Sequence, residues 1–269
     1  MTGWRRLHGF LRNVWGSGLK RFRTLWRRES EWRATERMRE LEAANRELQE
    51  FAYSVSHDLR APLRSISGFT EIIRRRYHGE LSGEALHYFE NILVAAGRME
   101  RLIEDLLRYA RLGRRALIIK TVPLAKVIEE ARERLSAKLA ATRGTIVAPS
   151  DLPSVSGDPT LLGAIFLNVL DNALTYHRPG VAPEVLVTCQ VRGGRCTVVV
   201  SDNGIGIPEE HHQKIFRVFQ RLHTQEDYPG TGIGLAMVEK CVKALGGRVW
   251  VESRVGEGSR FFIELPGAV

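Results

Sequence analysis

Apolar and small residues recur three and four positions apart in the first third of the chain, which is the a/d repeat of a helix that packs in a bundle. The repeat runs through Ala52, Val55, Leu59, Pro62, Ile66, Phe69 and Ile73. Upstream it continues through Met38, Leu41, Asn45 and Leu48. The pattern predicts one long helix over about residues 29–76.

His57 falls at position f of this repeat, the position farthest from the bundle core, so we expect its imidazole to face water. This phase disfavours the interpretation of His57 as a buried structural residue. Pro62 lies inside the pattern, and we expect it to bend the helix because it removes one backbone hydrogen bond. A proline inside a helix costs about 3 kcal/mol, which favours a functional role for this segment.

A turn is predicted at residues 78–83, and a second repeat follows it. Its members are Ala85, Phe89, Ile92, Ala96, Met99, Ile103, Leu106 and Ala110. Two long helices joined by a short loop form an antiparallel hairpin. Because a hairpin cannot bury an apolar stripe on each arm by itself, we expect a homodimer through the hairpin, which gives a four-helix bundle.

Beyond residue 112 the pattern changes to mixed α/β, and residues 113–120 read as a linker. Helices are predicted at about residues 123–141, 159–176 and 234–245, and strands at 145–148, 184–191, 195–201, 248–253 and 259–265. Asp158 is the predicted N-cap of the second of these helices, with Pro159 at its first position. The predicted fold class is multidomain, with an all-α antiparallel helical hairpin followed by an α/β sandwich domain.

The net charge of +9 is concentrated at the N-terminus. Residues 1–28 hold eight basic residues and no acidic one, which leaves about +1 for the rest of the chain. Binding to nucleic acid is not indicated, because such proteins carry their basic patch on a folded domain. The three cysteines form no CxxC pair and no Cys/His metal spacing, which favours a reducing cytoplasmic location without zinc or disulfides.

The basic tail, residues 1–28, has no apolar run long enough for a membrane span or a signal peptide. As a helix it would carry tryptophans on one face and arginines on much of the rest, which is a basic amphipathic pattern. Two interpretations stay open: peripheral contact with the inner face of the membrane, or a solvated tail upstream of a coiled coil. The tail is too short for a sensing domain, so we expect a separate sensor protein, sensing by the tail itself, or a longer parent protein.

Three clusters in the second domain have the composition of a nucleotide site. Asn168 and Asn172 are four apart on one predicted helix, so their carbonyl oxygens can hold a hard cation such as Mg²⁺. The segment DNGIGIP begins at Asp202, after a predicted strand, and its glycines let a flat ring approach the backbone. The segment GTGIG, residues 230–234, leads into a helix whose free N–H groups favour phosphate.

Taken in order, these clusters and the segment HDLRAPLRSISGF from His57 resemble the sensor histidine kinases of two-component signalling. The phytochrome-like branch is the most similar, since it carries phrases close to RVFQRLHT and YPGTGIGLA, which begin here at residues 217 and 228. The resemblance covers residues 30–269. It implies a dimerisation and phosphotransfer hairpin at residues 29–112 and a catalytic ATP-binding domain at residues 121–269.

The resemblance also implies the chemistry. His57 is expected to accept the γ-phosphoryl group of ATP, with Asp58 as its general base. An aspartate on the receiver domain of a response regulator is the expected final acceptor. Because an unperturbed imidazole is mostly neutral near pH 7, one ring nitrogen is ready to attack.

The ATP site is carried over in the same way. Asn172, with Asn168 beside it, is expected to hold Mg²⁺, and Asp202 to accept a hydrogen bond from the adenine amino group. The other residues implied are Tyr176, Gly204, Gly206, Gly230, Gly232 and Gly234. The last two glycines are expected to close a lid over the phosphates, with Phe216 and Phe219 packing beneath it. Ordinary core packing of these phenylalanines is compatible with that role.

Two residues depart from the family pattern. Many members carry a lysine three residues after the magnesium asparagine, where this chain has Thr175, so we expect weaker ATP binding or slower autophosphorylation. Many members carry Thr or Asn four residues after the histidine, where it orients a water. Ala61 has no polar group, so we expect weak phosphatase activity.

Two other functions compete with the kinase. A nucleotide-binding signalling scaffold without turnover is suggested by Thr175. An ATP-gated clamp, as in type II topoisomerases and mismatch-repair ATPases that share the sandwich fold, leaves the HDLRAPL hairpin unexplained.

Overall fold

The computed structural model describes residues 32, 36, 39, 53–56, 58–112, 116–222, 228 and 230–268. The chain divides into two units, Met1–Ser54 and Val55–Val269, and the elements named below belong to the second unit. The expectations for residues 1–28 and for the orientation of His57 lie outside the described residues, and of the predicted helix upstream of residue 53 the structure describes Trp32, Glu36 and Arg39, each of them helical.

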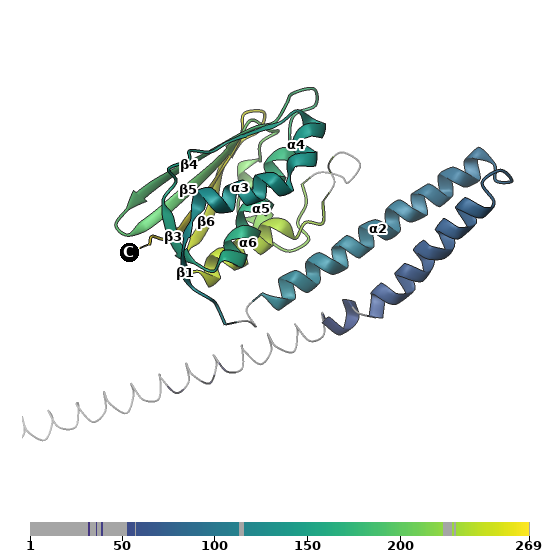
Figure 1. Ribbon diagram of the computed structural model, residues 1–269, viewed down its shortest axis with the longest axis horizontal. Coiled ribbons are helices and arrows are strands. Elements are labelled where there is room, and N and C mark those ends of the chain that lie inside the picture. Colours follow the sequence, from purple (N-terminus) through teal and green to yellow (C-terminus); the bar gives the residue numbers. More distant parts are fainter. Residues whose placement is uncertain are drawn as a thin grey trace, which may run out of the picture. The chain divides into compact units, whose positions relative to one another are not determined.

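The second unit begins with a helical hairpin (Figure 1). Residues 58–76 form its first arm, which stays helical through Pro62. Helix α2 (Gly83–Arg111) forms the second arm, and the N-cap Ser82 accepts a hydrogen bond from the Ala85 N–H at 3.2 Å. The predicted pair of helices and the turn between them are confirmed.

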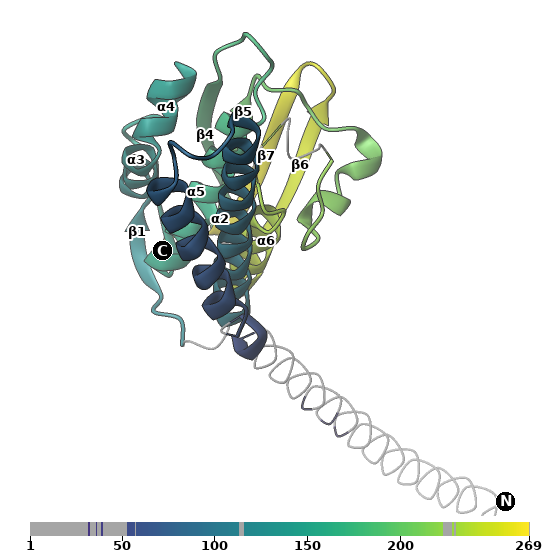
Figure 2. The same ribbon diagram turned by 90° about the vertical axis from the view of Figure 1, so that its right-hand side faces the viewer.

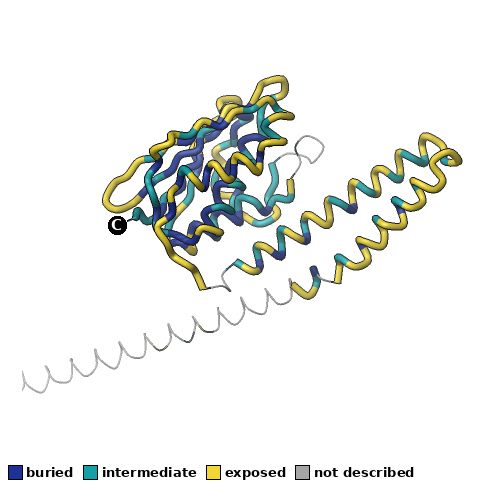
Figure 3. Tube along the Cα trace, in the orientation of Figure 1, coloured by how far each residue is buried: buried dark blue, intermediate teal, exposed yellow. Residues whose placement is uncertain are grey.

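The hairpin buries little of its apolar surface within one chain. A small cluster joins the arms through Leu63, Ala96, Ile103 and Leu107. The predicted stripe on the first arm stays open instead, with Ile66 52% and Phe69 67% exposed. Figure 3 shows exposed residues along much of both arms. A single hairpin therefore leaves this apolar stripe exposed, as expected for two helices that contact each other along one face only.

The rest of the unit is an α/β sandwich. Its helices are α3 (Leu124–Arg134), α4 (Ser136–Thr142), α5 (Pro159–Thr175) and α6 (Gly234–Ala244). Two 3₁₀ turns, η1 (Glu209–His211) and η2 (Lys214–Phe216), lie between β5 and α6. The strands are β1 (Lys120–Pro123), β2 (Thr145–Val147), β3 (Ser154–Gly157), β4 (Glu184–Arg192), β5 (Arg195–Asp202), β6 (Arg248–Arg254) and β7 (Gly258–Pro266).

The main sheet has the order β2-β4-β5-β7-β6, in which only the β2–β4 pair is parallel. Helices α3, α5 and α6 cover one of its faces (Figures 1 and 2). The core lies between these two layers, where Phe166 and Val169 of α5 and Val198 and Ile263 of the sheet are fully buried. This layer arrangement confirms the predicted sandwich.

Local sequence signals explain several element boundaries. Asp158 caps α5 by accepting hydrogen bonds from the N–H groups of Thr160 at 2.8 Å and Leu161 at 3.3 Å. Gly193 and Gly194 have φ values of 56° and 73° and turn the β4–β5 hairpin. These features were predicted from the sequence and are confirmed.

Near the start of this domain, one prediction was wrong and one pair of strands was missed. The helix expected at residues 123–141 is two helices, because the chain turns at Leu135, a buried residue with φ −95° and ψ 5°. The turn keeps Leu135 in the core while it points α4 toward α5. Strands β1 and β3 pair with each other and were not predicted, since four residues carry too little alternation to be recognised.

In the part of the chain that the structure describes, no helix combines the length and the apolar character that a membrane crossing needs.

Candidate active site

A cavity of about 540 Å³ brings the three predicted clusters together. Helix α5 lines it with Asn168 and Asn172, the end of β5 with Asp202, and the segment before α6 with glycines. The residues from the predicted set that line it are Asn168, Asn172, Tyr176, Asp202, Gly206, Gly230, Gly232 and Gly234. Apolar side chains of the same lining include Ile205, Ile207, Leu222 and Phe261. Such a cavity suits a flat apolar ring that carries a polar tail.

Asp202 is the acidic group at the end of β5. Its Oδ1 accepts hydrogen bonds from the backbone N–H groups of Gly204 at 2.9 Å and Ser259 at 3.1 Å. Burial raises the pKa of Asp202 to about 6, although these two hydrogen bonds act to lower it. The carboxylate is therefore mostly ionised at pH 7 and can accept a hydrogen bond from a ligand.

Two glycines hold the loop after β5 close to its neighbours. Gly204 is outside the cavity lining, but a Cβ there would lie 2.4 Å from the carbonyl oxygen of Tyr176. Gly206 has φ 73°, and a Cβ there would lie 1.9 Å from the carbonyl oxygen of Arg254. The loop can adopt this path only because both side chains are absent.

The two asparagines of α5 both line the cavity, and their amide oxygens are groups that can bind a cation. The Asn168 Nδ2 donates to the carbonyl oxygen of Ala164 at 2.8 Å, which leaves the Asn168 Oδ1 for another partner. Asn172 is one turn further along the same face and lines the same cavity. Amide oxygens are ligands that suit Mg²⁺. Among the described residues there is no group of three or more His, Cys, Asp or Glu side chains that could hold a metal ion instead.

The glycine segment ends at the first turn of α6. A Cβ on Gly234 would lie 2.9 Å from the Asn168 Oδ1, so this glycine lets α6 begin against the asparagine. The expectation for Phe219 was wrong, since its side chain is 58% exposed and does not pack beneath the segment. Its backbone N–H instead donates to the carbonyl oxygen of Gly232 at 2.9 Å, with φ 64° at Phe219. Phe216 is partly buried and packs against the core, which agrees with the alternative interpretation of this residue as ordinary core packing.

Tyr176 lies where α5 ends and forms one wall of the cavity. Its ring tilts against that of Tyr228, with 5.3 Å between centroids, and burial raises its pKa. The carbonyl oxygen of Tyr176 accepts a hydrogen bond from the Ile205 N–H at 3.0 Å. The end of α5 is therefore tied to the loop that follows Asp202.

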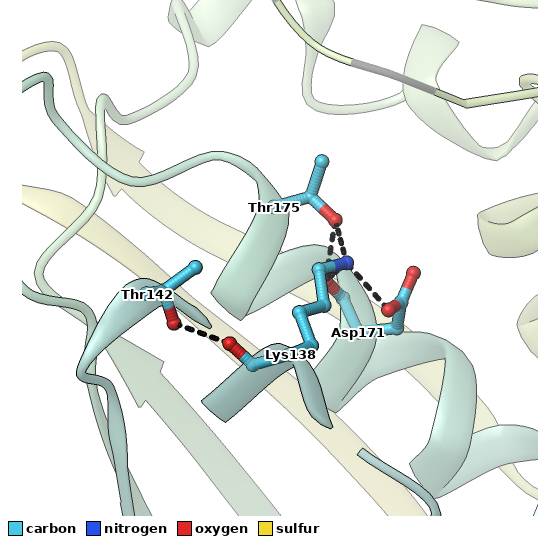
Figure 4. Close-up of polar contacts among 4 residues, drawn as sticks. All are labelled: Lys138, Thr142, Asp171 and Thr175. Atoms are coloured by element: carbon cyan, nitrogen blue, oxygen red, sulfur yellow. Dashed lines mark hydrogen bonds and ion pairs between the residues drawn. The ribbon is translucent and has the colours of Figure 1, made fainter. Parts of the chain in front are cut away.

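The structure adds residues that the sequence did not indicate. Lys138 of α4 lines the cavity and reaches Asp171 and Thr175 of α5 (Figure 4). Arg221 lines it as well, and its Nη2 donates to the carbonyl oxygen of Tyr228 at 2.7 Å. No local pattern identifies either residue, because each reaches the site through a tertiary contact.

Helix α2 also lines this cavity, with basic residues and with Asp105. The Thr231 hydroxyl donates to the Asp105 Oδ2 at 2.7 Å. On α6, the Lys240 Nζ donates to the carbonyl oxygen of Tyr109 at 2.7 Å. The same Nζ lies 4.2 Å from the centroid of the Tyr109 ring. Of the predicted phosphotransfer pair, Asp58 is exposed on the first arm outside the lining, and His57 lies outside the described residues.

Family models match both parts of the chain. The His Kinase A (phospho-acceptor) domain matches residues 47–115, and the histidine kinase-, DNA gyrase B- and HSP90-like ATPase matches residues 157–269. The second match covers α5, the Asp202 loop and the glycine segment, which are the parts that meet at the cavity.

Individual relatives agree with the family models. Cyanobacterial phytochrome A of Nostoc sp. is 34% identical over 227 residues, which cover 84% of this chain and 29% of the relative. Phytochrome-like protein Cph1 of Synechocystis sp. is 31% identical over 228 residues, 85% of this chain and 30% of the relative. The structure of full-length ShkA in complex with AMPPNP has a TM-score of 0.64 at 28% identity, over 82% of this chain and 46% of that one.

This chain therefore spans about three tenths of the length of the two phytochrome-type relatives. The hairpin, the sandwich domain and their order along the chain all agree with the matched models. The chain belongs to the sensor histidine kinases.

Proposed function

We propose that this chain is an ATP-dependent protein histidine kinase that autophosphorylates His57 and passes the phosphoryl group to an aspartate on a response regulator receiver domain. The observation that carries the proposal is the convergence of Asp202, Asn172 and the glycine segment on one cavity. The same chain holds residues 58–63, which follow His57 in the HDLRAPL segment, in a helical hairpin.

Each group in the cavity has a role in this proposal. The Asp202 carboxylate accepts a hydrogen bond from the adenine amino group, and the apolar side chains beside it cover the ring. Backbone N–H groups at the start of α6 bind phosphate oxygens, since they have no partner within the helix. Asn172 and Asn168 hold Mg²⁺, which when bound neutralises charge on the phosphates.

The phosphotransfer step is an in-line displacement. A ring nitrogen of His57 forms a bond to the γ-phosphorus, and the bond from that phosphorus to the bridging oxygen breaks. ADP leaves with the electron pair, and Asp58 takes the proton from the other ring nitrogen as positive charge develops. The receiver carboxylate then displaces the histidine in a second transfer.

The proposal assigns a separate role to each part of the chain. Residues 29–112 form the dimerisation and phosphotransfer part, residues 113–120 a linker and residues 121–269 the ATP-binding part. The exposed stripe of the first arm supports a homodimer, because a second copy can cover it. The eight basic residues of the tail support peripheral contact with an anionic membrane.

A pulse-chase experiment tests the full proposal. The protein is first labelled with γ-labelled ATP and Mg²⁺, freed of nucleotide, and mixed with purified receiver domains. We expect label to leave this protein and appear on a receiver, and to be absent from a receiver whose phosphate-accepting aspartate is changed to alanine. If the protein binds ATP but transfers label neither to itself nor to a receiver, the scaffold without turnover is favoured.

A further inference from the structure

The ammonium group of Lys138 is directed from α4 onto one face of α5 (Figure 4). Its Nζ donates to the Asp171 Oδ1 at 2.5 Å, to the Asp171 carbonyl oxygen at 3.1 Å and to the Thr175 hydroxyl. The Thr175 hydroxyl in turn donates to the Asp171 carbonyl oxygen at 2.7 Å. The cation is therefore held at position 175, although the residue at that position is neutral.

This position is part of the nucleotide face of α5. Asn168, Asn172 and Thr175 are spaced by four and three, so they follow one another along a single face of the helix. Each of them lines the cavity, as do Lys138 and Asp171. Lys138 therefore stands beside the predicted magnesium asparagines, on the side toward the end of α5.

We propose that Lys138 binds the phosphate chain of ATP and supplies from α4 the positive charge that α5 lacks at Thr175. The inference rests on the proposed function, because it takes the cavity to be the ATP site. It revises the expectation that Thr175 leaves the site short of a cation.

The surroundings of Lys138 permit this role. The Lys138 and Asp171 side chains keep 29% and 45% of their exposure, so their ion pair is partly solvated and contributes little to stability. The phosphate chain carries several negative charges and can replace the single carboxylate as a partner. The Asp171 carboxylate then competes with the phosphate chain for the ammonium group, which leaves Asp171 when the nucleotide binds.

The competing explanation is that Lys138 only fastens α4 to α5. Three variants distinguish a role in holding α4 against α5 from a role in phosphate binding, because the two roles predict different ATP affinities. Lys138→Met removes the cation, and Asp171→Asn breaks the ion pair but keeps the cation. The double variant Lys138→Met/Thr175→Lys moves the cation to the helix where many relatives carry it.

The measurement is the dissociation constant of each variant for ATP and ADP by titration calorimetry, with adenosine followed by ligand-observed NMR. We expect Lys138→Met to bind ATP at least tenfold more weakly, since a charge-assisted hydrogen bond is lost, and to bind adenosine like the wild type. Asp171→Asn keeps wild-type ATP affinity or exceeds it. The double variant recovers ATP affinity to within about threefold of the wild type.

Other results overturn the inference. If Lys138→Met binds ATP as the wild type does, or loses adenosine binding equally, Lys138 does not contact phosphate. If Asp171→Asn binds ATP at least tenfold more weakly than the wild type, the Lys138–Asp171 pair only holds α4 against α5, and this comparison with the wild type decides the matter even if Lys138→Met fails to fold. A wild-type protein that binds neither ATP nor ADP contradicts the proposed function itself.

Discussion

The backbone N–H of Gly204 donates a hydrogen bond of 2.9 Å to the Asp202 Oδ1, so the loop after β5 closes on the carboxylate that ends the strand. The contact orients the carboxylate but does not offset its burial, which raises the pKa of Asp202 to about 6. A ligand site that keeps a partly buried charge has a cost in stability, and that cost can be measured.

Asp202→Asn tests this cost. Because the folded-state pKa of about 6 lies above the ordinary value of 3.8, the folded protein holds the proton more tightly. The stabilising contribution is complete below pH 4 and is lost as pH rises through 6. At pH 8 we expect the nucleotide-free variant to exceed the wild type in free energy of unfolding by up to about 3 kcal/mol, with no difference near pH 3, below the ordinary pKa of 3.8.

Urea denaturation at both pH values measures the effect, and calorimetry should show at least tenfold weaker ATP binding by the same variant. A variant that is more stable and yet binds less nucleotide is the signature of a binding residue. Equal stability at pH 8, or unchanged ATP affinity, would contradict the role given to Asp202.

Gly206→Ala tests the path of the same loop. A Cβ at this position would lie 1.9 Å from the carbonyl oxygen of Arg254, so backbone must move, and we expect a loss of about 2 kcal/mol or more in free energy of unfolding. Gly256→Ala is the matched control, since Gly256 has φ 83° but open space around it. It should cost only the left-handed backbone strain of about 1 kcal/mol. Similar losses in both variants would show that the close approach is unimportant.

Ile66→Glu combined with Phe69→Glu tests the homodimer. Both residues are more than half exposed in one chain, and charges on this stripe should prevent a second copy from covering it. Light scattering after gel filtration should show a dimer for the wild type and a monomer for the variant. Val94→Glu, at an exposed position outside the predicted stripe, should remain dimeric. A monomeric wild type would refute the four-helix bundle.

Ala61→Thr tests the expected weak phosphatase activity. A threonine hydroxyl four residues after His57 can orient a water toward the phosphorylated receiver, whereas alanine cannot. We expect faster loss of phosphate from the receiver in the presence of this variant. Ala61→Val has the same branching without the hydroxyl and should match the wild type. Rapid dephosphorylation by the wild-type protein would show that Ala61 does not limit this activity.

The sequence predicted those parts of the fold that depend on short-range signals. Asp158-Pro159 fixed the start of α5, and Gly193-Gly194 fixed the β4–β5 turn, because caps and turns require particular residues at particular positions. Asp202 and the two asparagines were found in the same way, since each follows or occupies a regular element. Whether they perform the predicted chemistry stays a prediction.

The missed features depend on contacts between distant segments. In the sequence, Lys138 cannot be distinguished from any exposed lysine of an amphipathic helix. Its contact with Thr175 depends on the turn at Leu135, which directs α4 toward α5. Phe219 was expected beneath the glycine segment because of its type, yet its positive φ turns the side chain outward while its N–H contacts Gly232. The hydrophobic periodicity of the sequence predicts neither the Lys138–Thr175 contact nor the exposed side chain of Phe219.

The central claim is that this chain phosphorylates its own His57. The most direct measurement is incubation with γ-labelled ATP and Mg²⁺, comparing the wild type with His57→Ala and testing the label for lability in acid. The account predicts acid-labile label on the wild type and none on His57→Ala. Label that persists in His57→Ala, or its absence from a wild-type protein that binds ATP, would contradict it.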